Sequence, residues 1–225
     1  MSEPLLPCLE VAPRSPARAS VIFLHGLGAD GHDFEPVVPL LRTDGVRFVF
    51  PHAPAIPITI NGGFVMPGWY DIRSFSFDDA GREDATQIEA TARRISALVQ
   101  AERDRGIPAD RIVIGGFSQG AAMAMHVGVR HPDRLAGVLA LSGYLVLGDR
   151  LAKERSAANR ATPMLLCHGH ADDVVPIAAG RASLAALKAT ADPEATIEWN
   201  AFPIGHEVSP DEIAIVGAWL RARLG

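Results

Sequence analysis

Short apolar runs alternate with amphipathic segments along most of the 225-residue chain. The runs are rich in β-branched and aromatic residues, and turn-forming or polar residues follow most of them, which favours strands. The predicted strands are 19–25, 46–50, 111–114, 138–141, 163–167 and 196–202. Because these runs are almost continuously apolar, they indicate a parallel sheet that is covered on both faces.

The segments between the predicted strands have helical periodicity. In residues 83–105, apolar side chains recur at steps of three and four, as on one face of an amphipathic helix. Further helices are predicted at 121–129, 176–189 and 210–224. This alternation predicts an α/β fold with a mostly parallel central sheet and helices on both faces. Ligands of such sheets bind beyond the carboxyl ends of the strands.

Composition and charge limit the function classes. A chain of 225 residues, 48% apolar, suits a single α/β domain spanning residues 1–225. The net charge is −5 without a cluster of Lys and Arg, which argues against a nucleic-acid partner. Cys8 and Cys167 are too few for a disulfide framework. With no signal-peptide pattern and no long apolar stretch, we expect a cytoplasmic protein without stable membrane insertion.

Ser118 is the first candidate for a chemical role. It lies in Gly116-Phe117-Ser118-Gln119-Gly120, between a predicted strand and a predicted helix. This order is typical of a nucleophile elbow, a tight turn that exposes the serine oxygen. The backbone N–H of Gln119, directly after the serine, is then expected to face a developing oxyanion.

A serine nucleophile needs a base and an acid, which follow it in the order acid, then histidine, in this kind of sheet. Three of the histidines that follow Ser118 are considered as the base. His126 and His131 are expected to pack in the core and to cap the helix end, respectively. His206 lies between the last predicted strand and the last predicted helix, so it is the predicted base.

The acid is expected in the loop after strand 163–167. Asp172 and Asp173 both lie there, and the residues alone do not separate them, because either could reach His206 or cap the next helix. A second oxyanion donor is expected from His25-Gly26-Leu27-Gly28, after the first predicted strand, with the N–H of Leu27 as the candidate.

Six motifs together resemble the acyl-protein thioesterase/carboxylesterase family of small α/β-hydrolases, over almost the whole chain. They are 24–28, 51–54, 66–72, 116–120, 168–176 and 205–207. The resemblance implies an α/β-hydrolase fold, and the chain is too short for a separate lid domain. Since the acid of that family stands four residues before the loop proline, the resemblance favours Asp172. Residues 61–64 are similar to the bacterial carboxylesterase branch.

The resemblance implies a serine carboxylesterase that cleaves short- to medium-chain esters through an acyl-enzyme, without a cofactor or metal. Acyl-protein thioesterase or lysophospholipase activity on the same triad is the alternative, with a small-molecule or lipid ester as substrate. The long connection and the segment after the turn at residues 142–143 suggest an apolar groove, with Phe64, Trp69 and Leu145 as candidate pocket residues. Family members can pair near the site, so a homodimer is compatible with the resemblance.

Two other classes are weaker. His168-x-His170-x-Asp172 is similar to part of a binuclear zinc motif, but the residue after Asp172 is Asp rather than His. A non-catalytic binding protein on the same scaffold would need a broken triad, and none of the three positions is visibly broken. Labelling of Ser118 by a fluorophosphonate separates these classes from a serine hydrolase.

Overall fold

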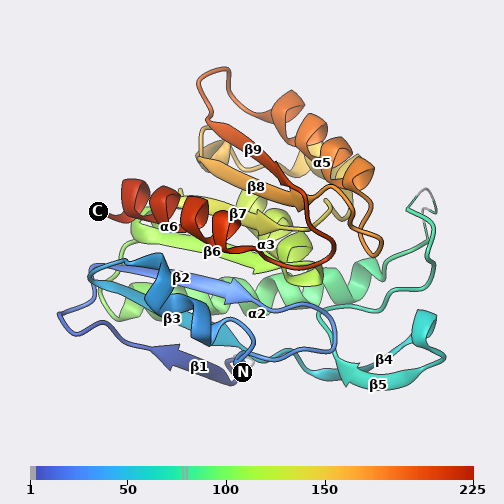
Figure 1. Cartoon of the computed structure of the whole chain (residues 1–225), viewed down its shortest axis with the longest axis horizontal. Helices are drawn as coiled ribbons and strands as arrows, with labels where there is room; N and C mark the ends of the chain where they lie inside the picture. Colours follow the sequence, from blue (N-terminus) through green and yellow to red (C-terminus); the bar gives the residue numbers. More distant parts are fainter. Residues whose placement is uncertain (1–3, 78, 80) are drawn as a thin grey trace.

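The computed structural model describes residues 4–77, 79 and 81–225. Its main sheet has seven strands in the order β1-β3-β2-β6-β7-β8-β9 (Figure 1). They are β1 (Cys8–Val11), β2 (Ala19–Leu24), β3 (Val46–Pro51), β6 (Ile112–Phe117), β7 (Gly137–Leu141), β8 (Met164–Gly169) and β9 (Ile197–Phe202). All neighbouring pairs are parallel except β1 with β3. The predicted parallel sheet is confirmed, and β1 is an antiparallel edge strand that the sequence pattern missed.

Helices cover both faces of the sheet. They are α1 (Val38–Leu41), α2 (Ala85–Asp104), α3 (Gln119–Arg130), α4 (Leu151–Glu154), α5 (Ile177–Thr190) and α6 (Pro210–Leu224). Figure 1 shows α6 in front of the sheet and α2 and α3 behind it. Side chains of α2, α3 and α5 pack on one face, and those of α1 and α6 pack on the other.

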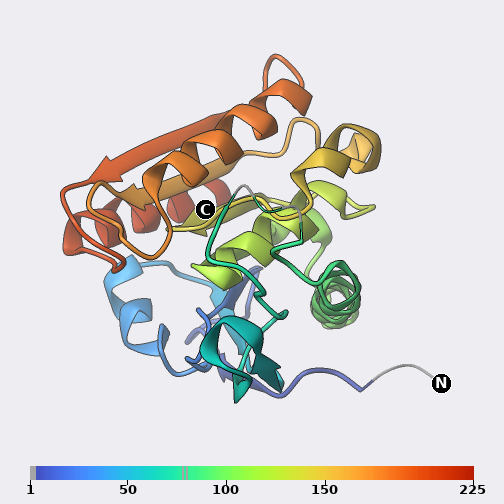
Figure 2. The ribbon, with the colours of Figure 1, turned by 90° about the vertical axis from the view of Figure 1, so that its right-hand side faces the viewer.

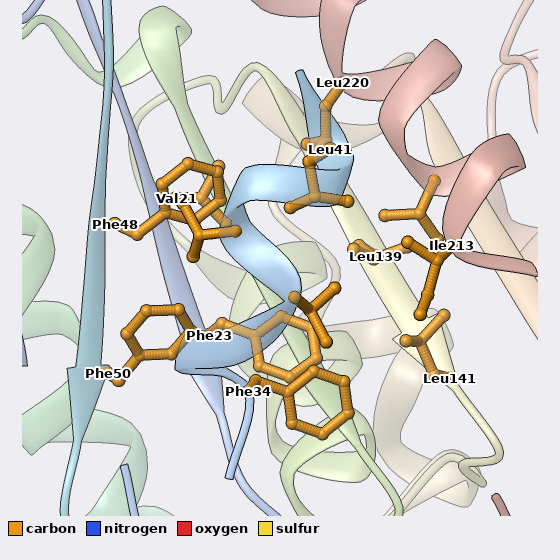
Figure 3. Close-up of a pocket in the computed structure, with 13 residues that line it drawn as sticks. Val21, Phe23, Phe34, Leu41, Phe48, Phe50, Leu139, Leu141, Ile213 and Leu220 are labelled. Atoms are coloured by element: carbon orange, nitrogen blue, oxygen red, sulfur yellow. The ribbon is translucent and has the colours of Figure 1, made fainter. Parts of the chain in front are cut away.

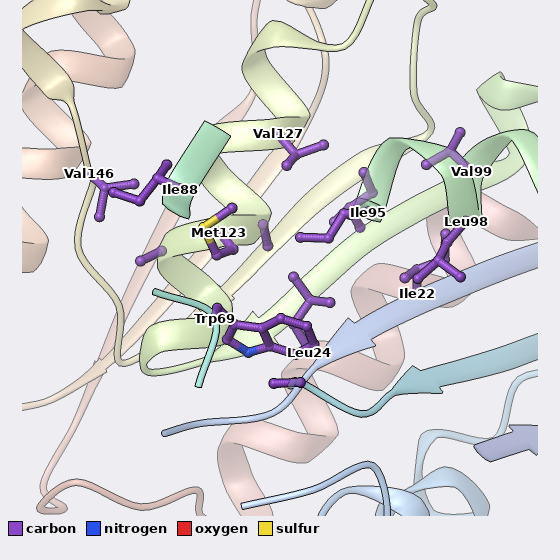
Figure 4. Close-up of a cluster of buried hydrophobic side chains, with 14 of the residues drawn as sticks. Ile22, Leu24, Trp69, Ile88, Ile95, Leu98, Val99, Met123, Val127 and Val146 are labelled. Atoms are coloured by element: carbon purple, nitrogen blue, oxygen red, sulfur yellow. The ribbon is translucent and has the colours of Figure 1, made fainter. Parts of the chain in front are cut away.

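Strand β2 shows why the sequence reads as continuously apolar. Ile22 and Leu24 join a core cluster with α2 and α3, which includes Trp69 (Figure 4). Val21 and Phe23 face the opposite way, toward α1 and α6. Between these helices and the strands lies an apolar cavity of about 30 Å³, lined by aromatic and aliphatic side chains (Figure 3). Because both faces are buried, both alternate sets of side chains in β2 are mainly apolar.

The long connection after β3 contains a small hairpin, β4 (Ala55–Ile58) paired antiparallel with β5 (Phe64–Pro67). It lies outside the main sheet, beyond the carboxyl ends of the strands (Figures 1 and 2). Phe64 and Val65 are 66% and 58% exposed, so the hairpin presents apolar side chains to solvent. Among the described residues, no helix has the length and apolar character that crossing a bilayer requires.

Candidate active site

Ser118 occupies a strained turn between β6 and α3. Its φ is 54° and its ψ is −119°, a left-handed backbone conformation that is unfavourable for a residue with a side chain. Tight packing maintains the turn, because a Cβ at Gly116 would overlap Gly120 and a Cβ at Gly120 would overlap the carbonyl of Leu24. Both flanking glycines are therefore needed, and Ser118 takes the position of a nucleophile on an elbow.

The structure brings Ser118, His206 and Asp172 together at the carboxyl edge of the sheet. Nε2 of His206 lies 2.9 Å from Oγ of Ser118. Nδ1 of His206 lies 2.8 Å from Oδ2 of Asp172. If Nδ1 carries the proton and donates it to the carboxylate, then Nε2 is free to accept the serine O–H. The three side chains form a continuous hydrogen-bonded series across 88 residues of sequence.

Backbone donors hold the carboxylate of Asp172 in place. Its Oδ1 accepts the N–H groups of Val174, at 3.0 Å, and Val175, at 2.8 Å. Oδ2 faces Nδ1 of His206 at 2.8 Å, and Nε2 of His168 lies 3.5 Å from the same oxygen. Asp173 is exposed, and no hydrogen bond joins it to His206 in the described part of the chain. The geometry thus separates the two acids that the residues alone left open.

The two candidate oxyanion donors lie on adjoining loops. Gly120 packs directly against the carbonyls of Leu24 and His25, so the start of α3 touches the loop that carries Leu27. Within residues 4–77, 79 and 81–225, neither the N–H of Leu27 nor that of Gln119 donates a hydrogen bond to another protein group. Amide donors without an internal partner, beside a partly exposed serine, suit the binding of an oxyanion.

The other buried histidines near the site have structural partners. His25 accepts the N–H of Ala53 at Nε2 (3.0 Å), and His168 lies 2.8 Å from the carbonyl of Val175 through Nε2. Burial lowers the pKa of both imidazoles, which favours their neutral forms. His126 is buried, with a pKa lowered by burial to about 3, and His131 is the C-cap residue of α3. His126 thus packs in the core and His131 lies at the helix end, as expected from the sequence.

The expected pocket wall is different in the structure. Trp69 is 1% exposed and belongs to the core, so it does not line an open groove. Phe64 projects from the hairpin into solvent. Leu145 does line a groove, which has a volume of about 750 Å³ and runs along the small side chains of α5, with Phe77 and Tyr144 on other walls. Trp69 was misassigned because a buried aromatic residue and a pocket aromatic residue look alike in sequence.

The histidines of the zinc-like motif do not converge. His168 is buried whereas His170 is exposed. In the part of the chain that the structure describes, no three His, Cys, Asp or Glu side chains gather closely enough to hold a metal ion. His168 instead belongs to β8, and His170 and Asp172 lie in the loop that follows this strand.

Comparison with known proteins identifies the family to which the chain belongs. The phospholipase/carboxylesterase family model matches residues 8–224. Acyl-protein thioesterase 1 of Gibberella zeae is 39% identical over 92% of this chain and 91% of its own length. The counterpart in Yarrowia lipolytica is 34% identical over 98% and 99%. Acyl-protein thioesterase 2 of Zea mays has a TM-score of 0.86 at 30% identity, over 97% of this chain and 99% of its own.

The structure of Arabidopsis thaliana SOBER1 has a TM-score of 0.85 at 29% identity and covers 93% of this chain and 100% of its own. Fold and relatives together define a serine hydrolase with the α/β-hydrolase fold. The chain belongs to the phospholipase/carboxylesterase family, as its sequence motifs had indicated.

Proposed function

We propose that this enzyme hydrolyses acyl esters through a covalent acyl-enzyme on Ser118, with thioesters as its preferred class. The observation that carries the proposal is the series from Ser118 through His206 to Asp172, with separations of 2.9 and 2.8 Å. A serine oxygen is a weak nucleophile unless a base takes its proton, and this arrangement supplies the base and its orienting acid.

In the acylation step, Oγ of Ser118 attacks the carbonyl carbon of the substrate while Nε2 of His206 takes the serine proton. Negative charge then develops on the former carbonyl oxygen. The N–H groups of Leu27 and Gln119 would stabilise it, and one such donor is typically worth about 3 kcal/mol. The tetrahedral intermediate collapses when the proton on Nε2 passes to the departing alcohol or thiol.

Deacylation repeats these steps with water. His206 takes a proton from a water molecule, whose oxygen attacks the acyl carbon, and the proton then returns to Oγ of Ser118. Asp172 keeps the proton of the imidazole on Nδ1 throughout and stabilises the positive charge that forms on the ring. The free acid leaves and the serine is restored.

The relatives support the choice of thioesters, because the curated proteins named above are acyl-protein thioesterases. The groove that Leu145 lines supports a linear acyl chain. Its lining includes Pro176, four residues after Asp172, and Ala178, Ala182 and Ala186 along one face of α5. This face extends for about 12 Å at the rise of an α-helix, a length that suits short to medium chains.

A substrate panel tests this proposal. Acetyl, octanoyl and palmitoyl chains would each be offered as the thioester and as the oxygen ester, to the wild type and to Ser118→Ala. We expect the highest kcat/KM for the octanoyl thioester. Ser118→Ala should lose at least about 10³-fold of kcat on every substrate, since the nucleophile acts in all of them.

Labelling provides a second readout. A fluorophosphonate should modify the wild type with one equivalent at Ser118 and leave Ser118→Ala unmodified. Turnover that survives in Ser118→Ala would refute the acyl-enzyme. If turnover still requires Ser118 but oxygen esters or palmitoyl substrates are cleaved fastest, the acyl-enzyme stands. Only the proposed substrate preference is then overturned.

A further inference from the structure

A buried amide side chain connects the nucleophile elbow to the segment after the hairpin. Oε1 of Gln119 accepts the backbone N–H of Trp69 at 2.8 Å, and its Nε2 donates to the carbonyl of Tyr70 at 2.8 Å. Gln119 is 1% exposed, and the hydroxyl of Thr91 on α2 also donates to the Trp69 carbonyl, at 2.6 Å. The backbone of Trp69 is thus held from two helices.

The indole of Trp69 continues this connection to the other oxyanion loop. Its Nε1–H donates to the carbonyl of His25 at 2.8 Å. The same carbonyl packs against Gly120, the residue after Gln119. Figure 4 shows the indole of Trp69 beside Leu24, at the end of β2 where this loop begins. The loop that carries Leu27 therefore contacts Trp69 on one side and the start of α3 on the other.

The imidazole of His25 fixes the next peptide unit. Because Nε2 of His25 accepts the N–H of Ala53, Nδ1 carries the proton and donates to the carbonyl of Gly26 at 2.7 Å. That carbonyl and the N–H of Leu27 belong to one planar peptide group, in which they point in opposite directions. Holding the carbonyl therefore sets the direction of the Leu27 N–H.

We propose that Trp69 and the side chain of Gln119 are positioning residues that align the Leu27 and Gln119 amides for the oxyanion. This inference rests on the proposed function, because it assigns these amides a role in acyl transfer. Neither side chain touches the substrate. Each acts through the backbone of a loop that does, and a misaligned donor stabilises the transition state less than an aligned one.

Trp69→Phe tests this role, since it removes the indole N–H and keeps an aromatic ring in the core. We expect kcat to fall about tenfold, less than the 10²- to 10³-fold typical of losing a whole oxyanion donor. The loss should be the same for acetyl, octanoyl and palmitoyl substrates, with KM changed less than about twofold. An unchanged kcat would overturn the proposal, as would a KM that rises with chain length, which is the signature of a pocket wall.

Trp219→Phe is the matched control. Trp219 is also buried, in the cluster on the opposite face of the sheet, and its indole N–H has no hydrogen-bond partner among the described residues. The same substitution there should leave kcat unchanged. An equal loss in both variants would mean that Trp69 has a general packing role only.

Gln119→Met provides a second variant should Trp69→Phe fail to fold. It keeps the backbone N–H of Gln119 and a side chain of similar length, but it removes both side-chain hydrogen bonds. We again expect a fall in kcat that is equal for all chain lengths. Wild-type kcat in Gln119→Met would refute the inference while leaving the proposed function intact, because that function depends on the separate Ser118→Ala result.

Discussion

Two buried carboxylates follow Ser118 in the chain, one before His206 and one after it in sequence. Their surroundings differ. Asp172, in the loop between β8 and α5, is 7% exposed, and Glu212, in the first turn of α6, is 1% exposed. Asp172 accepts two backbone N–H groups and pairs with His206. Neither carboxylate oxygen of Glu212 has a hydrogen-bond partner within the described residues.

The difference separates a carboxylate prepared for chemistry from one that is only buried. Burial raises the pKa of Glu212 to about 7, and the nearby N–H of Ser209 offsets only part of this effect. In the proposed mechanism, the donors around Asp172 stabilise its negative charge while the imidazole of His206 becomes positive. Burial alone therefore does not identify a catalytic acid. Asp172 is proposed as the acid because it also has backbone donors and a histidine partner that contacts Ser118.

The largest effect should come from Asp172→Asn. An asparagine can present its NH₂ group to Nδ1 of His206, which favours the tautomer with the proton on Nε2, facing Ser118. The histidine could then no longer accept the serine proton. We expect a loss of about 10³- to 10⁴-fold in kcat with KM little changed, measured on the octanoyl thioester.

Thermal unfolding of Asp172→Asn would control for a folding defect, and slower labelling by a fluorophosphonate should accompany the loss of kcat. A loss below about tenfold would show that Asp172 does not orient the base, and the contrast with Glu212 would then disappear.

Glu212→Gln should change stability rather than catalysis. The carboxyl of Glu212 has a pKa raised from 4.5 to about 7 in the folded chain, so the folded state holds its proton more tightly than the unfolded state does. The stability associated with this proton is fully present below about pH 4.5 and is lost as the pH rises through about 7. At pH 8 the buried carboxylate is charged, and glutamine should stabilise the fold by on the order of 2 kcal/mol.

Urea unfolding of the wild type and Glu212→Gln at pH 5 and pH 8 measures this gain, which should be larger at pH 8. Asp211→Asn is the matched control, because Asp211 lies in the same helical turn but is exposed. An equal gain at both pH values, or in both variants, would contradict a specific cost of burying the Glu212 charge.

The sequence was sufficient for most of the fold because buried parallel strands are apolar on both faces. It missed β1, since a four-residue edge strand beside prolines has little periodicity. It also missed the hairpin of β4 and β5, whose exposed Phe64 and Val65 do not alternate with polar residues. The partner of β1 is the distant strand β3, and local patterns do not contain that contact.

The candidate catalytic residues were easier to predict from the sequence than the residues that hold them in position. Ser118 and His206 could be proposed because chain order and strand ends restrict where a nucleophile and its base can lie. The hydrogen bonds of Gln119 and Trp69 join residues 50 positions apart, and no spacing rule reveals them. A glutamine among small and apolar residues at the start of α3 was the one local signal, because a buried amide needs partners.

The smallest effect should come from Asp173→Asn, the neighbour that the residues alone could not separate from Asp172. Asp173 is exposed, and the N-cap position of α5 is Pro176, without a side-chain hydrogen bond, so Asp173 does not cap that helix there. Removing its charge should change kcat by less than about twofold and stability by at most about 0.5 kcal/mol. Measuring kcat and the free energy of unfolding in urea for Asp173→Asn and Asp172→Asn side by side would give the ratio of the two effects. A loss of kcat in Asp173→Asn comparable to that in Asp172→Asn would mean that the loop exchanges its two carboxylates at His206, because the geometry described above leaves Asp173 no other route to the base.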